Sequence, residues 1–146
     1  MTFLVASILF ILDRVTKIVA VSNMSYGQSI KILPNIFHFT FVLNNGTAFG
    51  LFKGANSALA VLSVLVITLI IFYVLKNKAV ANSLALGLIL GGAIGNLFDR
   101  MRFGYVIDFI DLHLWPVFNV ADSCITVGAV LLFVMIIRGE DASRII

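Results

Sequence analysis

Long segments without a charged residue constrain the fold of this chain more than any other feature of its sequence. Residues 54–75 and 79–98 contain no Asp, Glu, Lys or Arg, and residues 117–137 contain only Asp122. At a rise of about 1.5 Å per residue, roughly 20 helical residues cross a hydrocarbon core of about 30 Å. We therefore predict transmembrane helices at about 54–75, 79–98 and 117–137.

The overall composition indicates the same class of protein. The chain is 61% hydrophobic and 12% charged, with a mean hydropathy of +1.11, whereas about 25% of an average soluble domain is charged. Its 146 residues suffice for one membrane-embedded domain, 1–146. A single cysteine excludes a disulfide within the chain, and no basic run predicts a nucleic-acid partner.

Residues 2–21 form a fourth apolar segment, interrupted by Asp13, Arg14 and Lys17. This segment partly resembles a cleaved secretory signal, but no basic residue precedes it and the charges fall where such a signal stays apolar. We therefore favour an uncleaved first helix. Four helices place both termini on one side of the membrane and the connecting segments 22–53 and 99–116 on the other.

Residues 22–53 are predicted to form a small β region at the membrane surface. In residues 37–43, apolar side chains recur at every second position, as on one face of a strand. Residues 44–46 (Asn-Asn-Gly) favour a tight turn, after which residues 47–52 are expected to return as a second strand. We expect His38 to face water or headgroups. The predicted fold class is an all-α polytopic membrane protein with four helices and a small surface sheet.

Most polar residues of this topology fall at the interface that the two connecting segments share. A charged residue inside a span costs roughly 2.5–3.5 kcal/mol, so the four charges of the first and fourth helices, if unpaired, would cost on the order of 10 kcal/mol. They must be paired, face inward or lie near water, and such residues indicate a functional site. The group comprises Asp13, Lys17, Asn44, Asn96, Asp99, Arg100, Asp108, Asp111, Asn119 and Asp122.

Several of these residues also have purely structural explanations. Asp13 and Lys17 lie one helical turn apart, which favours a structural ion pair. Asp99 with its neighbouring arginines fits an ordinary interfacial charge cluster as well as a site. Asn119 either hydrogen-bonds between helices or orients a carboxylate, and both roles stay open.

The sequence offers few groups for metal or nucleophilic catalysis. His38 and His113 are the only histidines, and no HExxH or paired-cysteine spacing is present, so we expect no metal and no cofactor. Cys124 is a weak candidate nucleophile because it points away from Asp122 around the helix. No serine nucleophile elbow is present either.

Two carboxylates, Asp108 and Asp122, remain as candidates. Adjacent carboxylates do not both ionise cheaply, so they share a proton and titrate as a unit. One member then draws a proton from water while the other hydrogen-bonds or protonates the substrate carbonyl. The segment between them can fold back to bring them together. This inventory favours aspartic-type amide hydrolysis.

Five motifs, in order, resemble those of one known family. They are LDRVTK (12–17), NNGTAFG (44–50), GGAIGNLFDR (91–100), VIDFID (106–111) and FNVADSCITVG (118–128). Over nearly its whole length the chain resembles the lipoprotein signal peptidases (signal peptidase II), which are bacterial four-helix aspartic peptidases.

The resemblance implies roles for individual residues. Asp108 and Asp122 would form the catalytic dyad. Asp13, Lys17 and Asp99 would support the site structurally. A further set would bind substrate or orient the dyad: Asn44, Gly46, Asn96, Arg100, Asn119 and Ala121.

The resemblance also implies a substrate and a location. The substrates would be prolipoproteins, cleaved just before a cysteine that carries a diacylglyceryl group, and globomycin-type cyclic peptides would inhibit. The protein would be a multi-pass, monomeric protein of the bacterial cytoplasmic (inner) membrane, in contact with lipid. Its termini would be cytoplasmic and its active site extracytoplasmic. Basic residues are balanced between the two sides, so the positive-inside rule does not decide the orientation.

Two other functions compete with the peptidase. A small proton-coupled transporter would also use intramembrane Asp and Arg, but the second predicted helix carries no ionisable group in its apolar run except Tyr73. A non-enzymatic assembly subunit would use the polar residues only to join helices.

Overall fold

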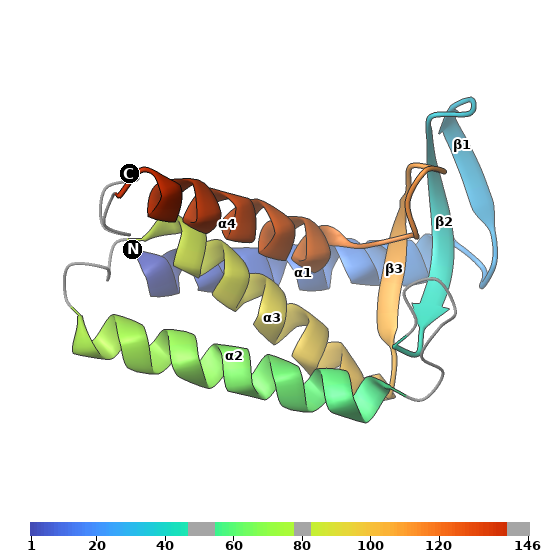
Figure 1. Ribbon diagram of the computed structural model, residues 1–146. Helices are drawn as coiled ribbons and strands as arrows, with labels where there is room; N and C mark the ends of the chain where they lie inside the picture. Colours follow the sequence, from blue (N-terminus) through green and yellow to red (C-terminus); the bar gives the residue numbers. More distant parts are fainter. Residues whose placement is uncertain (47–54, 78–82, 140–146) are drawn as a thin grey trace.

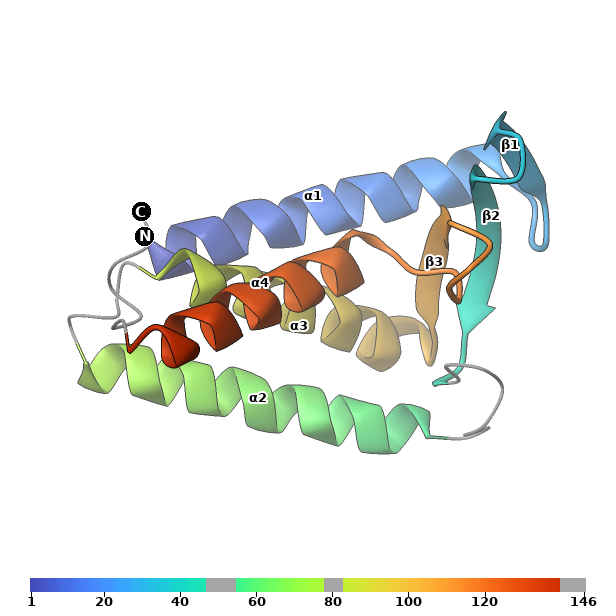
Figure 2. The same cartoon turned by 45° about the horizontal axis from the view of Figure 1, so that its top comes forward.

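The computed structural model describes residues 1–46, 55–77 and 83–139, and within them the protein is mostly helical. The helices run side by side and a small sheet closes one end of the bundle (Figure 1). The start of the first helix and the end of the last lie at the opposite end (Figure 2). The elements are α1 (Thr2–Asn23), β1 (Ser29–Leu33), β2 (Phe37–Asn44), α2 (Asn56–Lys76), α3 (Leu84–Phe103), β3 (Val106–Asp111) and α4 (Val120–Ile137).

Three helices, α2, α3 and α4, are long and apolar enough to cross a membrane. α1 has a comparable length, but Asp13, Arg14 and Lys17 leave it less apolar. Length and composition therefore support three spans among the described residues. Most of the large apolar side chains of α2 are exposed on the surface of the protein, as expected for a helix that faces lipid.

The third helix differs from its prediction at both ends. α3 begins at Leu84, where the Ser83 hydroxyl accepts a hydrogen bond from the Leu86 N–H at 3.3 Å, and it ends where Gly104 takes a φ of +80°. The apolar run alone had placed it at 79–98, and residues 78–82, with part of the predicted turn at 76–78, lie outside the described residues. The cap and the glycine stop fix the helix instead. Asp99 and Arg100 therefore lie on α3 and not in a loop.

The sheet contains a strand that the sequence analysis missed. β3 comes from the predicted 99–116 loop and pairs antiparallel with β2, which also pairs antiparallel with β1. Asp108, expected in a loop, is thus held on a strand opposite Val42. The predicted return strand at 47–52 lies outside the described residues.

The alternation predicted for residues 37–43 is interrupted. The β2–β3 register shifts between Phe39 and Val42, and the buried residues of β2 are His38 and Phe41. His38 precedes this shift and is only 6% exposed, with the ring of His113 packed against its own at a centroid distance of 4.0 Å. The expectation that His38 faces water or headgroups was therefore wrong.

Glycines on α3 let its neighbours approach closely. A Cβ on Gly91 would lie 2.8 Å from the carbonyl oxygen of Ala6 on α1, and one on Gly92 would lie 2.4 Å from that of Ala121 on α4. Small residues at such crossings allow backbones into contact, as is common between membrane helices. The GGAIGN segment thereby places α1, α3 and α4 around one polar centre.

Candidate active site

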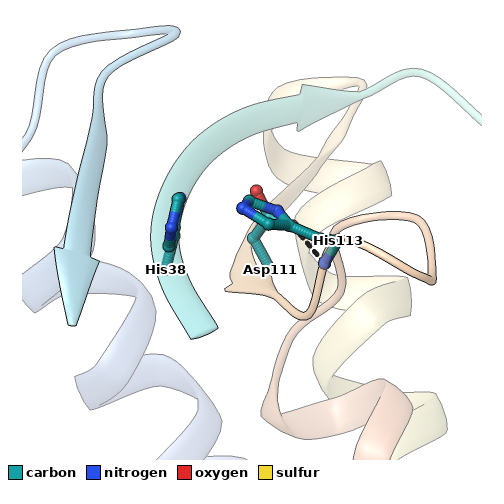
Figure 3. A group of neighbouring side chains, drawn as sticks. All are labelled: His38, Asp111 and His113. Carbon is teal, nitrogen blue, oxygen red and sulfur yellow. Dashed lines mark hydrogen bonds and ion pairs between the residues drawn. The ribbon is translucent and has the colours of Figure 1, made fainter. Parts of the chain in front are cut away.

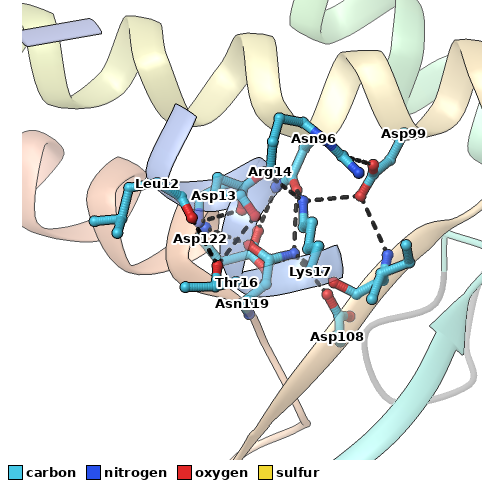
Figure 4. Close-up of polar contacts among 12 residues, drawn as sticks. Leu12, Asp13, Arg14, Thr16, Lys17, Asn96, Asp99, Asp108, Asn119 and Asp122 are labelled. Atoms are coloured by element: carbon cyan, nitrogen blue, oxygen red, sulfur yellow. Dashed lines mark hydrogen bonds and ion pairs between the residues drawn. The ribbon is translucent and has the colours of Figure 1, made fainter. Parts of the chain in front are cut away.

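A cluster of buried charges joins α1 to α3. The Lys17 ammonium, completely buried, lies 2.8 Å from an oxygen of Asp13 and 2.8 Å from an oxygen of Asp99 (Figure 4). The ion pair expected between Asp13 and Lys17 is therefore present. Arg14 pairs with the other oxygen of Asp99 and lies over the ring of Phe98. Two cations and two carboxylates thus neutralise one another in a cluster in which only Arg14 is partly exposed.

The same cluster reaches the adjacent helix and strand. The Ala121 N–H, in the first turn of α4, donates to Asp13 at 3.1 Å. The Ile107 N–H of β3 donates to Asp99 at 3.3 Å. Backbone donors that the start of a helix leaves unpaired are satisfied here by a carboxylate from another helix. Asp13 and Asp99 therefore fix the positions of the two elements that carry Asp122 and Asp108.

Asn96 and Asn119 connect this cluster to the two candidate catalytic carboxylates. The Asn96 carbonyl accepts from Lys17 at 3.1 Å and from the Asn119 amide at 3.1 Å. The Asn96 amide donates to Asp122 at 2.7 Å, and the Asn119 amide donates to Asp108 at 2.7 Å. One buried asparagine thus faces each carboxylate, with its orientation set by its other hydrogen bonds.

Asp122 stands in the first turn of α4 as part of a capping box. Asn119 caps the helix and accepts from the Asp122 N–H at 2.9 Å, while the Asp122 carboxylate accepts from the Asn119 N–H at 3.2 Å. A carboxylate is favourable at a helix N-terminus, where unpaired N–H groups and the helix dipole both attract it. This local chemistry explains how an otherwise apolar helix begins with an ionisable residue.

Asp108 is 1% exposed and accepts hydrogen bonds from two asparagines. Asn119 donates to one of its oxygens, and Asn44 donates to the other at 2.8 Å. Burial, followed by the negative charge of Asp122, raises the pKa of Asp108 to about 7, although both asparagines and Lys17 oppose the rise. A proton on this carboxyl group is therefore available at neutral pH.

Gly46 positions Asn44. The backbone N–H of Gly46 donates to the side-chain oxygen of Asn44 at 3.0 Å, so that the side-chain NH₂ of Asn44 is directed at Asp108. Gly46 takes a φ of +96°, and a Cβ there would lie 2.8 Å from the backbone nitrogen of Asn56. Only glycine fits both the conformation and the space.

Arg100 lies one residue after Asp99 on α3 and is half-buried. The charges of Asp122, Asp108 and Asp99 act on its guanidinium. Its buried Nε has no hydrogen-bond partner among the described residues. A half-buried guanidinium with an unpaired donor is well suited to a polar group of a ligand.

Both carboxylates border open space. Asp122 lines a largely apolar pocket of about 340 Å³ together with Leu112, Trp115 and Phe118. Asp108 lines a smaller pocket of about 190 Å³ together with Asn44, Pro116 and Val117. The segment that follows β3 therefore borders both pockets, and each carboxylate lines one of them.

The structure brings together nearly every residue proposed from the sequence. One continuous network of hydrogen bonds and ion pairs joins nine of them: Asp13, Lys17, Asn44, Asn96, Asp99, Asp108, Asn119, Ala121 and Asp122. Gly46 lies beside Asn44, and the guanidinium of Arg100 interacts electrostatically with Asp122, Asp108 and Asp99. The sequence analysis assigned no partner to Arg14, although its place beside Asp13 in an apolar segment indicated that one was required.

Comparisons with known proteins identify the family. A model of signal peptidase II matches residues 5–138. The lipoprotein signal peptidase of Halothermothrix orenii is 41% identical over 141 residues, 96% of this chain and 97% of the relative. That of Pelotomaculum thermopropionicum is 36% identical over 143 residues, 97% and 94% of the two chains.

Two solved structures of bacterial membrane enzymes share the fold. One has a TM-score of 0.84 at 30% identity and covers 94% of this chain and 87% of its own. The other has a TM-score of 0.81 at 30% identity and covers 92% and 91%. The fold and its acidic site thus define a bacterial membrane enzyme. The chain belongs to the signal peptidase II family of lipoprotein signal peptidases, and it is therefore a protease.

Proposed function

We propose that the protein is an aspartic endopeptidase that removes the signal peptide from diacylglyceryl-modified prolipoproteins. It cleaves before the lipidated cysteine, using water activated by Asp108 and Asp122. Family membership supports the substrate class. The observation that carries the mechanism is the position of Asn119, which donates from its side chain to Asp108 and from its backbone to Asp122. This residue contacts both carboxyl groups, each of which lines one of the two pockets.

The chemistry follows from one proton held by the pair. Asp108, with its pKa raised to about 7, carries that proton and hydrogen-bonds the scissile carbonyl oxygen. Asp122 is the base: it takes a proton from water as the oxygen attacks the carbonyl carbon. The proton then passes to the amide nitrogen as the C–N bond breaks. No covalent intermediate with the protein forms.

The surrounding residues bind the peptide or hold the dyad in place. Asn44, ordered by Gly46, and Arg100 face the substrate side of the carboxylates, while Asn96, Asn119 and the backbone of Ala121 hold the start of α4. Asp13, Lys17 and Asp99 support this arrangement from behind. The apolar pocket beside Asp122 suits the apolar residues or the lipid of the substrate.

We also propose that α1 is a fourth span of this single membrane-embedded peptidase domain. Its 22 residues give a helix of about 33 Å, enough to cross a core of about 30 Å. Its charges are paired with α3, which lowers the cost of placing them in the membrane. The sheet and the dyad then lie at the extracytoplasmic face of the cytoplasmic membrane, with cytoplasmic termini. We expect the protein to act as a monomer sensitive to globomycin.

The test is the processing of a lipidated precursor, followed by gel shift, in membranes that contain equal amounts of each variant. Asp108→Asn and Asp122→Asn should each reduce the cleavage rate by at least about a thousandfold, as expected for removal of an acid or a base. Cys124→Ala is the matched control, because it alters a buried residue of the same helix and should cleave normally. Full cleavage by either asparagine variant would overturn the dyad.

A further inference from the structure

A second group of ligand-type side chains lies on the sheet, apart from the dyad. His38 on β2 pairs across the ladder with Asp111 on β3, and His113 follows two residues later (Figure 3). The imidazole rings of the two histidines have centroids 4.0 Å apart, at 77° to each other. One nitrogen of each histidine and one carboxylate oxygen of Asp111 all lie within 4.8 Å of one another.

His38 supplies a nitrogen whose hydrogen-bonding capacity is unused. Its side chain is 6% exposed, and its Nε2 is buried with no hydrogen-bond partner among the parts of the chain that the structure describes. Its Nδ1 lies 3.3 Å from the Ser29 hydroxyl, which holds the ring in place. A buried polar atom without a partner is costly, and a metal ion is one of the few groups that satisfies an imidazole nitrogen there. Metal-binding histidines commonly use their second nitrogen in a contact of this kind.

The other two residues are also held in position. One oxygen of Asp111 accepts from the Thr40 hydroxyl at 2.7 Å, and the other lies 3.1 Å from the His113 Nδ1. His113 has a φ of +61°, a conformation that non-glycine residues seldom adopt, and its N–H donates to the same Asp111 oxygen at 2.9 Å. The backbone therefore fixes the imidazole of His113 beside the carboxylate.

We propose that His38, Asp111 and His113 form a binding site for a divalent transition metal, with Zn²⁺ as the best fit. Two imidazoles and one carboxylate match the three-ligand sets of zinc, which leave a position for water. Mg²⁺ and Ca²⁺ prefer ligand sets made of oxygen alone. The sequence analysis expected no metal because it considered local spacing, whereas the pairing of β2 with β3 brings the two histidines together.

Bound metal would act on the segment that borders the substrate pocket. His113 belongs to the turn after β3 and lies between Leu112 and Trp115 in the sequence. Leu112 and Trp115 both line the pocket beside Asp122. A metal held jointly by β2 and this turn would fix the turn against the sheet. None of its ligands belongs to the Asp108–Asp122 dyad, so bond cleavage does not require this metal.

The test is zinc binding by the full-length protein in detergent, purified without a polyhistidine tag and stripped with a chelator. Titration against a chromogenic zinc chelator should show one equivalent of Zn²⁺ per chain, undisturbed by millimolar Mg²⁺. His113→Asn removes the imidazole but tolerates the positive φ, and His38→Gln removes the buried nitrogen. Each should weaken zinc binding at least about tenfold. Lys31→Gln, opposite His38 on β1, removes a nearby charge and no ligand, so its affinity should not fall.

Two results would overturn the zinc site: no Zn²⁺ uptake by the wild-type protein, or wild-type affinity in His113→Asn. His113 is exposed, so its replacement leaves the fold intact even if His38→Gln does not fold. Precursor processing in the presence of chelator should continue. Its complete loss would contradict the separation of the metal from the dyad, whereas failure of the dyad assignment would leave zinc binding unchanged.

Discussion

Replacing Asp108 with asparagine should remove a large part of the pH dependence of stability. The pKa of Asp108 rises from 3.8 to about 7 because the carboxyl group is buried and lies near the charge of Asp122. One pKa unit corresponds to about 1.4 kcal/mol, so a rise of roughly three units corresponds to about 4 kcal/mol. Because Asp108 is 1% exposed, solvent screening reduces this value little.

The direction of this pH dependence follows from which state of the protein, folded or unfolded, binds the Asp108 proton more tightly. Between about pH 4 and pH 7 the folded protein holds the Asp108 proton and the unfolded chain does not. The free energy of unfolding is therefore highest at low pH, falls as the pH rises through this window, and is constant above about pH 8 as far as Asp108 is concerned. Asparagine does not ionise, so the variant lacks this decline.

The Asp108→Asn substitution also lowers the free energy of unfolding by an amount that does not depend on pH. Both oxygens of Asp108 accept hydrogen bonds from amide groups, so the NH₂ of an asparagine would face a donor. Such a mismatch costs about 1–3 kcal/mol at every pH. The informative quantity is therefore the change with pH in the stability difference between Asp108→Asn and the wild type.

Thermal unfolding of both proteins in one detergent, from about pH 4 to pH 8, measures this change. The stability difference should move in favour of Asp108→Asn by about 4 kcal/mol across the range. In Asp122→Asn, which removes the second cause of the raised pKa, the decline should persist but move to lower pH. Parallel curves for Asp108→Asn and the wild type would refute the raised pKa.

Two further substitutions test the framework behind the dyad. Lys17→Met leaves Asp13 and Asp99 buried without this cation and should lower the free energy of unfolding by about 3–5 kcal/mol; an unchanged melting temperature in detergent would contradict the ion-pair cluster. Gly92→Ala places a Cβ 2.4 Å from the Ala121 carbonyl oxygen, which is backbone, so α3 and α4 must separate at a cost of about 1–3 kcal/mol. A melting temperature equal to that of the wild type would show that the helices are not in such close contact.

Local sequence patterns predicted the helices and part of the site. Uncharged runs identified the spans, and the four-residue spacing of Asp13 and Lys17 predicted their ion pair. Both patterns work because they depend on neighbours along one helix. The same reasoning set α3 five residues too early, because hydropathy does not register the cap at Ser83.

Contacts between distant segments were harder to predict. The pairing of Arg14 with Asp99 joins two helices, and nothing in either local sequence specifies it. β3 was taken for a loop because six residues next to charged helix ends give a weak strand pattern, and its identity depends on pairing with β2. The burial of His38 depends on the ring of His113, 75 residues away in the chain, which packs against it.

In the proposed four-span arrangement, the charge cluster links insertion of α1 to formation of the site. Arg14 and Lys17 are neutralised by Asp13 on the same helix and by Asp99 on α3, so α1 is a favourable membrane helix only once it has packed against α3. The packed arrangement is also the one in which Lys17 holds Asn96, and Asn96 holds Asp122. Changes in the cluster should therefore reduce stability and activity together. Changes in the carboxylates of the proposed dyad should abolish activity in a protein that still folds, because the buried ion pairs of Asp13, Lys17 and Asp99 remain intact.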